Sequence, residues 1–394
     1  MRWILTAFIA TLAAASASAA EPSPVPEWLK PGARVSYFQG SATIASDGQI
    51  LVQDDKGNWV NVAGQKFAVK DNPGTGGGGF TQLTIVAADA RVVAAEMRTF
   101  VLIDPKGGRV SFASVGALVG TPAALSDYWL SPASLAARPD SNEGGLSVHR
   151  MPYPLGGRTY NAIVVEMRSG TSYQRSTYDL ETGLLLAAST SAVGAGGFVP
   201  NPNGTSSMKA GGSLITSTVL AGVRQLKLPW GDDARPEAIV RGARFDYRGT
   251  YSTVVAGSPP VSQAITTNLT FGEPGAQWAQ ARFGVALASL LGGPPQTSVS
   301  DRVLGSWMTM PGWLQPKTIA RLAPGTVVDE DPVTRFRTTY LGVRGDSAVV
   351  VEEGPFDRVE AAFDVRSGVL AAANNVQQNG LGQTQVRVER VRGR

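Results

Sequence analysis

Short runs of alternating apolar and polar residues recur along the chain and predict antiparallel strands. In the first half they cover 32–37, 80–86, 91–103, 160–168 and 171–180. Turn residues separate them, and the totals of 46 Gly and 25 Pro favour many short strands over long helices. Two short helices are expected, because Thr121-Pro122 and Ser131-Pro132 each place a capping hydroxyl before a proline. The helix after Ser131 is expected to last about two turns, to Arg138. The fold class predicted is mainly β.

Two motifs occur twice in the same order. The motif Trp-Leu-Ser-Pro at 129–132 returns as Trp-Leu-Gln-Pro at 313–316, where Gln315 lacks the capping hydroxyl. The motif Tyr-Asp-Leu-Glu-Thr-Gly at 178–183 returns as Phe-Asp-Val-Arg-Ser-Gly at 363–368. In each, an Asp precedes a Gly by four positions, which predicts a tight turn whose Gly is left-handed. These matches predict a duplicated unit, because they preserve both order and spacing.

The two copies also begin alike, with Gly-Ala-Arg at 32–34 and 242–244. The predicted organisation is a signal peptide (1–20), a first β unit (21–228), a linker (229–235) and a second β unit (236–394). An insertion at 44–79 and a long exposed loop at 191–212 belong to the first unit. Each unit is expected to be a curved, half-barrel-like antiparallel sheet with short helices.

The first twenty residues are typical of an export signal. Arg2 precedes a short apolar stretch at 3–12, and small residues precede a cleavage site near Ala19 or Ala20. The chain has no cysteine, so disulfides and thiol nucleophiles are excluded. We expect a bacterial periplasmic or secreted protein.

The net charge of +4 is scattered along the chain, without the Lys/Arg run of a nucleic-acid interface. No nucleic-acid partner is therefore predicted. Weak peripheral contact with an anionic membrane surface stays open.

The strand, turn and apolar strand at 178–186 resemble those of the LolA/LppX-like periplasmic β half-barrels. The export signal and the long antiparallel meander agree with that family in kind. The resemblance implies a curved sheet around a hydrophobic cavity that holds acyl chains, or a sensor domain. The chain departs from the family in its duplication and in lacking the cysteine that anchors the lipoprotein members.

Catalytic chemistry finds little support in the residue types present. The one histidine, His149, excludes a multi-histidine metal site and argues against a Ser-His-Asp triad. Ser206 and Lys209 have the Ser-x-x-Lys spacing but fall in the predicted exposed loop. Asp54-Asp55 and the acidic run 329–331 lack the alternating ligands of a calcium loop and are expected to be solvated turns. We predict no enzyme, no metal and no cofactor, although a carboxylate pair for glycoside cleavage stays open.

Arg34 and Arg244 stand at matching positions and are expected to pair with a carboxylate such as Asp179 or Asp364, or to face an anionic ligand. Trp129 and Trp313 also match. They are expected to pack in the core or, as the candidate ligand-binding residues, to line a cavity for an apolar ligand. The predicted function is non-enzymatic binding of a lipid-like ligand in a curved β-sheet. The alternative is an envelope scaffold or protein-interaction module that binds another envelope protein.

Overall fold

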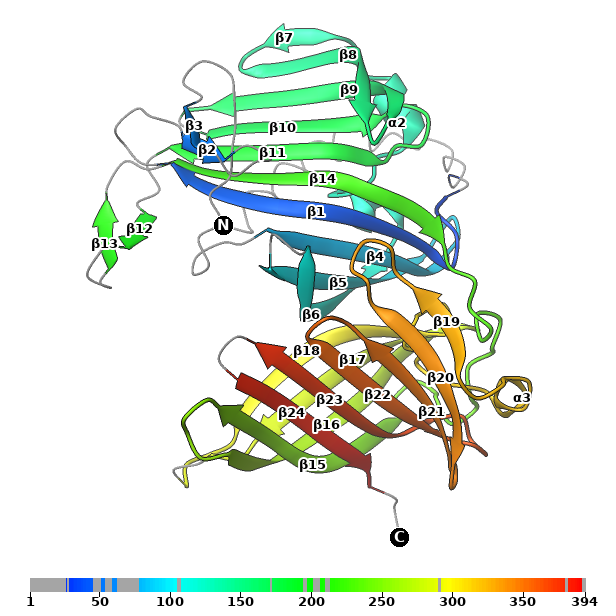
Figure 1. The fold of residues 1–394 in the computed structure, drawn as a ribbon. Coiled ribbons are helices and arrows are strands. Elements are labelled where there is room, and N and C mark those ends of the chain that lie inside the picture. The colour runs from blue at the N-terminus through cyan, green and yellow to red at the C-terminus, as the bar shows by residue number, and fades with distance from the viewer. Residues whose placement is uncertain are drawn as a thin grey trace. The chain divides into compact units, whose positions relative to one another are not determined.

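A computed structural model describes residues 26, 28–44, 51–53, 59–61, 78–104, 108–170, 172–193, 197–200, 206–209, 213–289, 292–379 and 382–391. The fold is mainly β, as predicted: two antiparallel sheets of ten strands each, with few short helices (Figure 1). The signal peptide and the turn at Asp54-Asp55 lie outside the described residues.

The first sheet has the strand order β6-β5-β4-β1-β14-β11-β10-β9-β8-β7. Its strands are β1 (Ala33–Ile44), β4 (Gly79–Ala88), β5 (Val93–Asp104), β6 (Arg109–Gly120), β7 (Ser141–Glu143), β8 (Leu146–Leu155), β9 (Arg158–Ser169), β10 (Ser172–Asp179), β11 (Leu185–Val193) and β14 (Ser213–Gln225). Two small hairpins lie outside this sheet: β2 (Leu51–Gln53) with β3 (Trp59–Asn61), and β12 (Gly197–Pro200) with β13 (Ser206–Lys209).

The second sheet has the strand order β18-β17-β16-β15-β24-β23-β22-β21-β20-β19. Its strands are β15 (Arg244–Val255), β16 (Val261–Pro274), β17 (Trp278–Leu287), β18 (Gln296–Gly305), β19 (Thr326–Glu330), β20 (Arg337–Arg344), β21 (Ser347–Glu353), β22 (Asp357–Asp364), β23 (Leu370–Asn379) and β24 (Gly382–Arg390).

The two sheets have the same topology. When the ten strands of each sheet are numbered along the chain, both orders read 4-3-2-1-10-9-8-7-6-5. In each copy the first strand lies beside the last, β1 beside β14 and β15 beside β24 (Figure 1). A short α-helix follows the fourth strand in both, α2 (Pro132–Ala136) and α3 (Pro316–Ile319). The duplicated motifs therefore mark a duplicated sheet.

Most predicted strands and turns are confirmed. Gly183 and Gly368 have φ of 74° and 70°, as the left-handed turns require. Ser131 caps α2, because its Oγ accepts a hydrogen bond from the Ser134 N–H. Gln315 provides no side-chain cap to α3.

Several details differ from the prediction. Helix α2 ends at Ala136 after little more than one turn, and Pro122–Leu125 (η1) is a 3₁₀ helix. The stretch 191–212 is not simply a loop, since β11 runs to Val193 and β12 and β13 form a hairpin within it. Ser206 and Lys209 lie in strand β13, where the helical geometry of a Ser-x-x-Lys site is lost.

Packing groups the chain into two compact units. Among the described residues, the first comprises residue 26 and those within 37–80 and 123–221, and the second comprises those within 28–36, 81–122 and 222–391. The strands β5 and β6 of the first sheet therefore belong to the second packing unit. By sheet membership, the chain divides near the predicted linker. By packing, segments of the first sheet belong to the second unit. The predicted domain boundaries therefore stay a prediction.

The core of the second unit consists of apolar side chains and a buried ionic cluster. Arg34 is 2% exposed, and its guanidinium donates hydrogen bonds to Thr84, Thr309 and Asp331. Arg98 donates two hydrogen bonds to the Glu352 carboxylate, at 2.8 and 2.5 Å. Arg98 lies on β5 and Glu352 on β21, two strands far apart in the sequence.

One prediction about charged residues is wrong, and in a second the predicted carboxylate pairs form with other partners than the two named. Asp331 is 1% exposed and forms ion pairs with Arg34 and Arg224, so this part of the acidic run is not a solvated turn. Arg34 pairs with Asp331 rather than Asp179, while its counterpart Arg244 is exposed and pairs with Asp246. The matching positions share a place in the sheet but have different surroundings.

Candidate functional site

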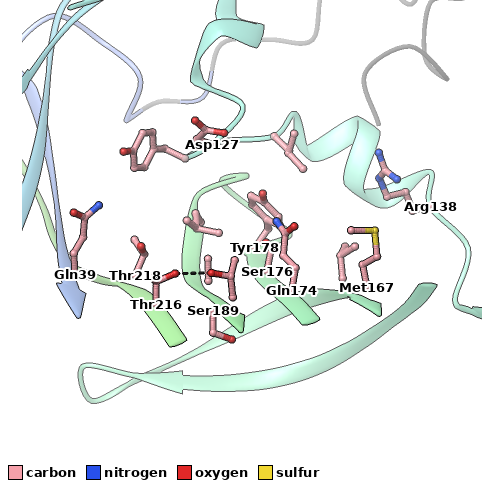
Figure 2. Close-up of a pocket in the computed structure, with 16 residues that line it drawn as sticks. Gln39, Asp127, Arg138, Met167, Gln174, Ser176, Tyr178, Ser189, Thr216 and Thr218 are labelled. Carbon is pink, nitrogen blue, oxygen red and sulfur yellow. Dashed lines mark hydrogen bonds between the residues drawn. The ribbon is translucent and has the colours of Figure 1, made fainter. Parts of the chain in front are cut away.

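A cavity of about 220 Å³ lies in the first unit, on one face of the sheet (Figure 2). Its floor is two rows of cross-strand neighbours that run over β9, β10, β11 and β14. One row is Val165, Ser176, Ala188 and Thr218, and the other is Met167, Gln174, Thr190 and Thr216. Because side chains alternate along a strand, these residues point to the same face of the sheet. The floor is therefore part apolar and part polar.

The roof of the cavity is residues 127–138, which include helix α2. Asp127, Tyr128, Leu130 and Arg138 of this segment line the cavity. Figure 2 shows Asp127 and Arg138 toward opposite ends of the roof, with the labelled floor residues on the strands below. The cavity therefore has ionisable groups toward both ends and Leu130 on the segment between them.

Trp129 fastens the roof to the sheet. It forms a β-bridge with Leu184, and its indole N–H donates a 2.9 Å hydrogen bond to the Thr182 carbonyl. The Leu130 N–H donates to the Gly183 carbonyl at 3.0 Å, and the Leu185 N–H donates to the Tyr128 carbonyl at 2.9 Å. The repeated motif thus fixes the two cavity residues on either side of Trp129.

The turn beneath Trp129 is fixed by Asp179. Its carboxylate accepts hydrogen bonds from the Thr182 N–H and hydroxyl at 3.2 and 2.5 Å. At Gly183 an added Cβ would lie 1.9 Å from the Leu130 carbonyl oxygen, so only glycine fits under the roof. Sequence reasoning identified this motif, and its structural role is to hold the roof on the floor.

The positions equivalent to one of the two floor rows are apolar in the second sheet, whereas the other row corresponds to Glu352, Val359, Asn375 and Val386. The row that matches Val165, Ser176, Ala188 and Thr218 in register is Val350, Ala361, Ala373 and Val388. Val350, Ala361 and Val388 are at most 8% exposed and belong to its hydrophobic core. Leu314, the counterpart of Leu130, is fully buried. Along this row, the second copy is packed with apolar side chains where the first has hydroxyls beside a cavity.

Several polar groups of the cavity have no protein partner. The Nε–H of Arg138 is buried and donates to no partner within the described ranges. The side chains of Gln174 and Thr218 form no hydrogen bond to any described residue, whereas Thr190 and Thr216 bond to each other at 2.5 Å. Gln174 and Thr218 are half-buried, so their polar groups and the buried Nε–H of Arg138 are available to a ligand.

The tyrosines of the lining remain protonated at neutral pH. Burial raises the pKa of Tyr178 to about 12, against the smaller effects of a hydrogen bond with Ser176 and the charge of Arg138. Burial, together with the Asp127 carboxylate, raises the pKa of Tyr128 to about 12. Partial burial also raises the pKa of Asp127. Both phenols can therefore donate hydrogen bonds into the cavity.

The predicted ligand residues lie in different surroundings. Trp129 is 6% exposed and is not among the residues that line the cavity, although its neighbours Tyr128 and Leu130 are. Trp313 is fully buried in the core of the second unit, and its indole N–H donates to the Asp233 carbonyl at 3.5 Å. Their role in ligand binding stays a prediction.

Sequence reasoning did not find the cavity residues. Hydroxyl residues on strands are common, and no motif distinguishes Ser176 or Thr218 from surface residues. One signal was available, since aligning the copies shows serine and threonine in the first where the second has alanine and valine.

Other chemistry is sparse in the described part of the chain. His149 lies on β8, away from the cavity lining. Within those residues no three His, Cys, Asp or Glu side chains are grouped so that they could hold a metal ion. None of the helices in the described ranges is long and apolar enough to span a bilayer.

Comparisons with known proteins give only distant similarity. No family model matches the chain, and no curated protein matches it. It is similar to the crystal structure of a protein of unknown function from the DUF3598 family of Nostoc punctiforme, with 12% identity over 92% of this chain and 97% of the other, and a TM-score of 0.14. It is also similar to the crystal structure of MucB in complex with MucA(peri), with 11% identity over 90% of this chain and 88% of the other, and a TM-score of 0.18. Similarity this low carries no argument about function, and the LolA/LppX-like resemblance stays unconfirmed.

Proposed function

We propose that this is an exported, non-enzymatic protein whose first unit binds a small amphiphilic molecule in the cavity between the sheet and residues 127–138. The observation that carries the proposal is the contrast between the two copies. Ser176 and Thr218 occupy register positions that Ala361 and Val388 fill in the second sheet. Both side chains are half-buried, and the Ser176 hydroxyl bonds to Tyr178. The Thr218 hydroxyl has no hydrogen-bond partner among the described residues, so it is available to a ligand.

The lining favours an amphiphile over a purely apolar cargo. Leu130, Val165, Met167, Leu185 and Ala188 offer apolar contacts. Hydroxyl, amide and charged groups make up most of the rest of the lining. The volume of about 220 Å³ is below the roughly 300 Å³ at which pockets for drug-sized ligands begin. The site therefore suits a small molecule or one end of a longer one.

Extraction of bound molecules, followed by titration with an environment-sensitive apolar dye, tests this function. The mature chain is purified without denaturant, extracted for bound molecules by organic solvent and mass spectrometry, and then titrated with the dye. The double variant Ser176→Ala with Thr218→Val, which copies the second sheet, is expected to lose dye binding at least tenfold. Its matched control is Ser172→Ala with Thr159→Val, at exposed positions of the neighbouring strands. A clean extract together with no dye uptake by the wild type would remove the proposal.

The second candidate function is an envelope interaction module. It is favoured by the end of the β15–β16 hairpin, where Val254, Val255 and Val261 are 42–44% exposed. Residues 249–264 carry no charge, which suits a contact with an apolar surface of another envelope protein. A photo-crosslinking residue at Val255 is expected to capture one defined protein in cells, and the same residue at exposed Thr159 is expected to capture none. Equal labelling at both positions would remove this candidate.

A further inference from the structure

The geometry points to an anionic headgroup on the ligand, bound by Arg138; this inference rests on the proposed function. The guanidinium lines the cavity at the end of the roof that Figure 2 shows above Met167. Its Nε is buried and has no hydrogen-bond partner in the described part of the chain. No ion pair of Arg138 with any described carboxylate is found, so its charge is left for a ligand.

The backbone of Arg138 is held in place by another arginine. Arg150 donates to the carbonyls of Ala136 and Arg138 at 3.1 and 2.7 Å and pairs with Asp140. Arg150 thereby takes the nearby carboxylate and fixes the end of α2. The side chain of Arg138 is left to face the cavity.

Arg138 is half-buried, and its buried Nε–H lacks an acceptor, which makes an anion the natural partner of this guanidinium. A guanidinium binds carboxylate or phosphate oxygens through several N–H groups in one plane. Tyr178 lies close enough for the Arg138 charge to affect it, and its protonated hydroxyl offers a further donor. The inferred ligand is an alkyl chain that ends in a carboxylate or a phosphate.

Asp127 restricts the ligand from the other side. Its carboxylate lines the roof toward the opposite end, where it would repel a second anionic group (Figure 2). A ligand with one anionic end is therefore expected to bind in one direction, with its headgroup at Arg138 and its chain toward Leu130 and Leu185.

Calorimetric titration with four probes of equal chain length tests the inference: octanoate, octyl phosphate, octanol and octyltrimethylammonium. The wild type is expected to bind octanoate or octyl phosphate at least tenfold more tightly than octanol, and the cation more weakly still. The ratio between the two anions identifies the headgroup. Arg138→Gln is expected to weaken binding of both anions at least tenfold and that of octanol far less, while Arg138→Lys keeps part of the preference for anions. The control is Arg158→Gln, an exposed arginine on β9 whose side chain is 63% exposed.

The outcomes separate the inference from the proposed function. Equal binding of octanol and both anions, unchanged in Arg138→Gln, would overturn the headgroup assignment while the cavity remained a binding site. Failure of all four probes to bind would count against both. Loss of octanol binding in Arg138→Gln would mean that Arg138 also maintains the cavity. That result would overturn the view that Arg138 acts only on the headgroup.

Discussion

Ser176 and Ala361 occupy the same position in the two copies of one sheet. Ser176 pairs with Val165 and Ala188, and Ala361 pairs with Val350 and Ala373. Ala361 is buried in a packed core, whereas Ser176 lines a cavity under residues 127–138. The same sheet topology thus supports two interiors, and along this row the difference is two hydroxyls, on Ser176 and Thr218, where the second copy has Ala361 and Val388.

Exchanging these side chains between the copies is expected to raise stability where hydroxyls are removed and to lower it where hydroxyls are added. Ser176→Ala with Thr218→Val should stabilise the protein by about 0.5–2 kcal/mol, because apolar groups replace half-buried hydroxyls, and that of Thr218 has no partner among the described residues. The reciprocal variant, Ala361→Ser with Val388→Thr, should destabilise it by about 1–3 kcal/mol for each buried hydroxyl. Urea unfolding of both variants measures these changes. Stabilisation by the reciprocal variant would contradict the view that the second copy is filled.

Gly183 is expected to be irreplaceable for two reasons that a pair of variants separates. Gly183 and Gly170 both have positive φ, 74° and 55°. At Gly170 an added Cβ meets nothing within 4 Å, whereas at Gly183 it meets the Leu130 carbonyl oxygen at 1.9 Å. Gly170→Ala should therefore cost only about 1 kcal/mol, from backbone strain. Gly183→Ala should cost clearly more and weaken dye binding, because the roof must move. Equal losses of stability in the two variants, measured by thermal unfolding, would contradict the role of this turn in holding residues 127–138 on the sheet.

The second copy has replaced a lost helix cap by a residue from the linker. Gln315 cannot cap α3, and Asp233 accepts hydrogen bonds from the Gln315 N–H and the Thr318 hydroxyl, at 3.1 and 2.6 Å. Asp233→Ala should cost about 1–2 kcal/mol in urea unfolding, as the loss of a cap does. Ser131→Ala, the equivalent change at α2, should cost about 1 kcal/mol. A neutral Asp233→Ala would show that the linker does not stabilise α3.

The buried ionic cluster predicts loss of stability in acid. Burial alone would raise the pKa of Asp331, but Arg34, the Thr334 N–H and Arg224 hold it well below its usual range. Arg98 likewise outweighs burial and lowers the pKa of Glu352. A depressed carboxyl pKa contributes stability that is complete above the unfolded pKa of about 4 and is lost as pH falls toward the folded value. The free energy of unfolding should therefore fall below about pH 4.

The variant Asp331→Asn tests that origin. It should cost about 3–5 kcal/mol at neutral pH, because a buried cation loses its partner. It should also make the acid dependence shallower. Asp301→Asn, at an exposed pair with Arg282, is the control and should change neither measurement. An unchanged acid slope in Asp331→Asn would show that other carboxylates determine it.

The sequence predicts the duplicated sheets because order and spacing survive in the motifs around Trp129 and Trp313. It also predicts the left-handed Gly183 and Gly368, since that conformation is a local property of the turn. It does not predict the partners of Arg34, which lies 297 positions from Asp331 in the chain. Long-range pairs of this kind depend on which strands pack together, and no local pattern records that. The cavity escaped prediction for the same reason, because its floor is a set of single residues from separate strands.

Methyl NMR during titration with octanoate tests the central claim, that one copy is hollow for a ligand and the other is filled. Saturable chemical-shift changes are expected at the methyls of Leu130, Val165 and Met167, while the methyl shifts of Val350, Ala361 and Val388 stay unchanged. Shifts confined to the second set, or absent from both at saturating octanoate while the ten-stranded sheets stay folded, would contradict it.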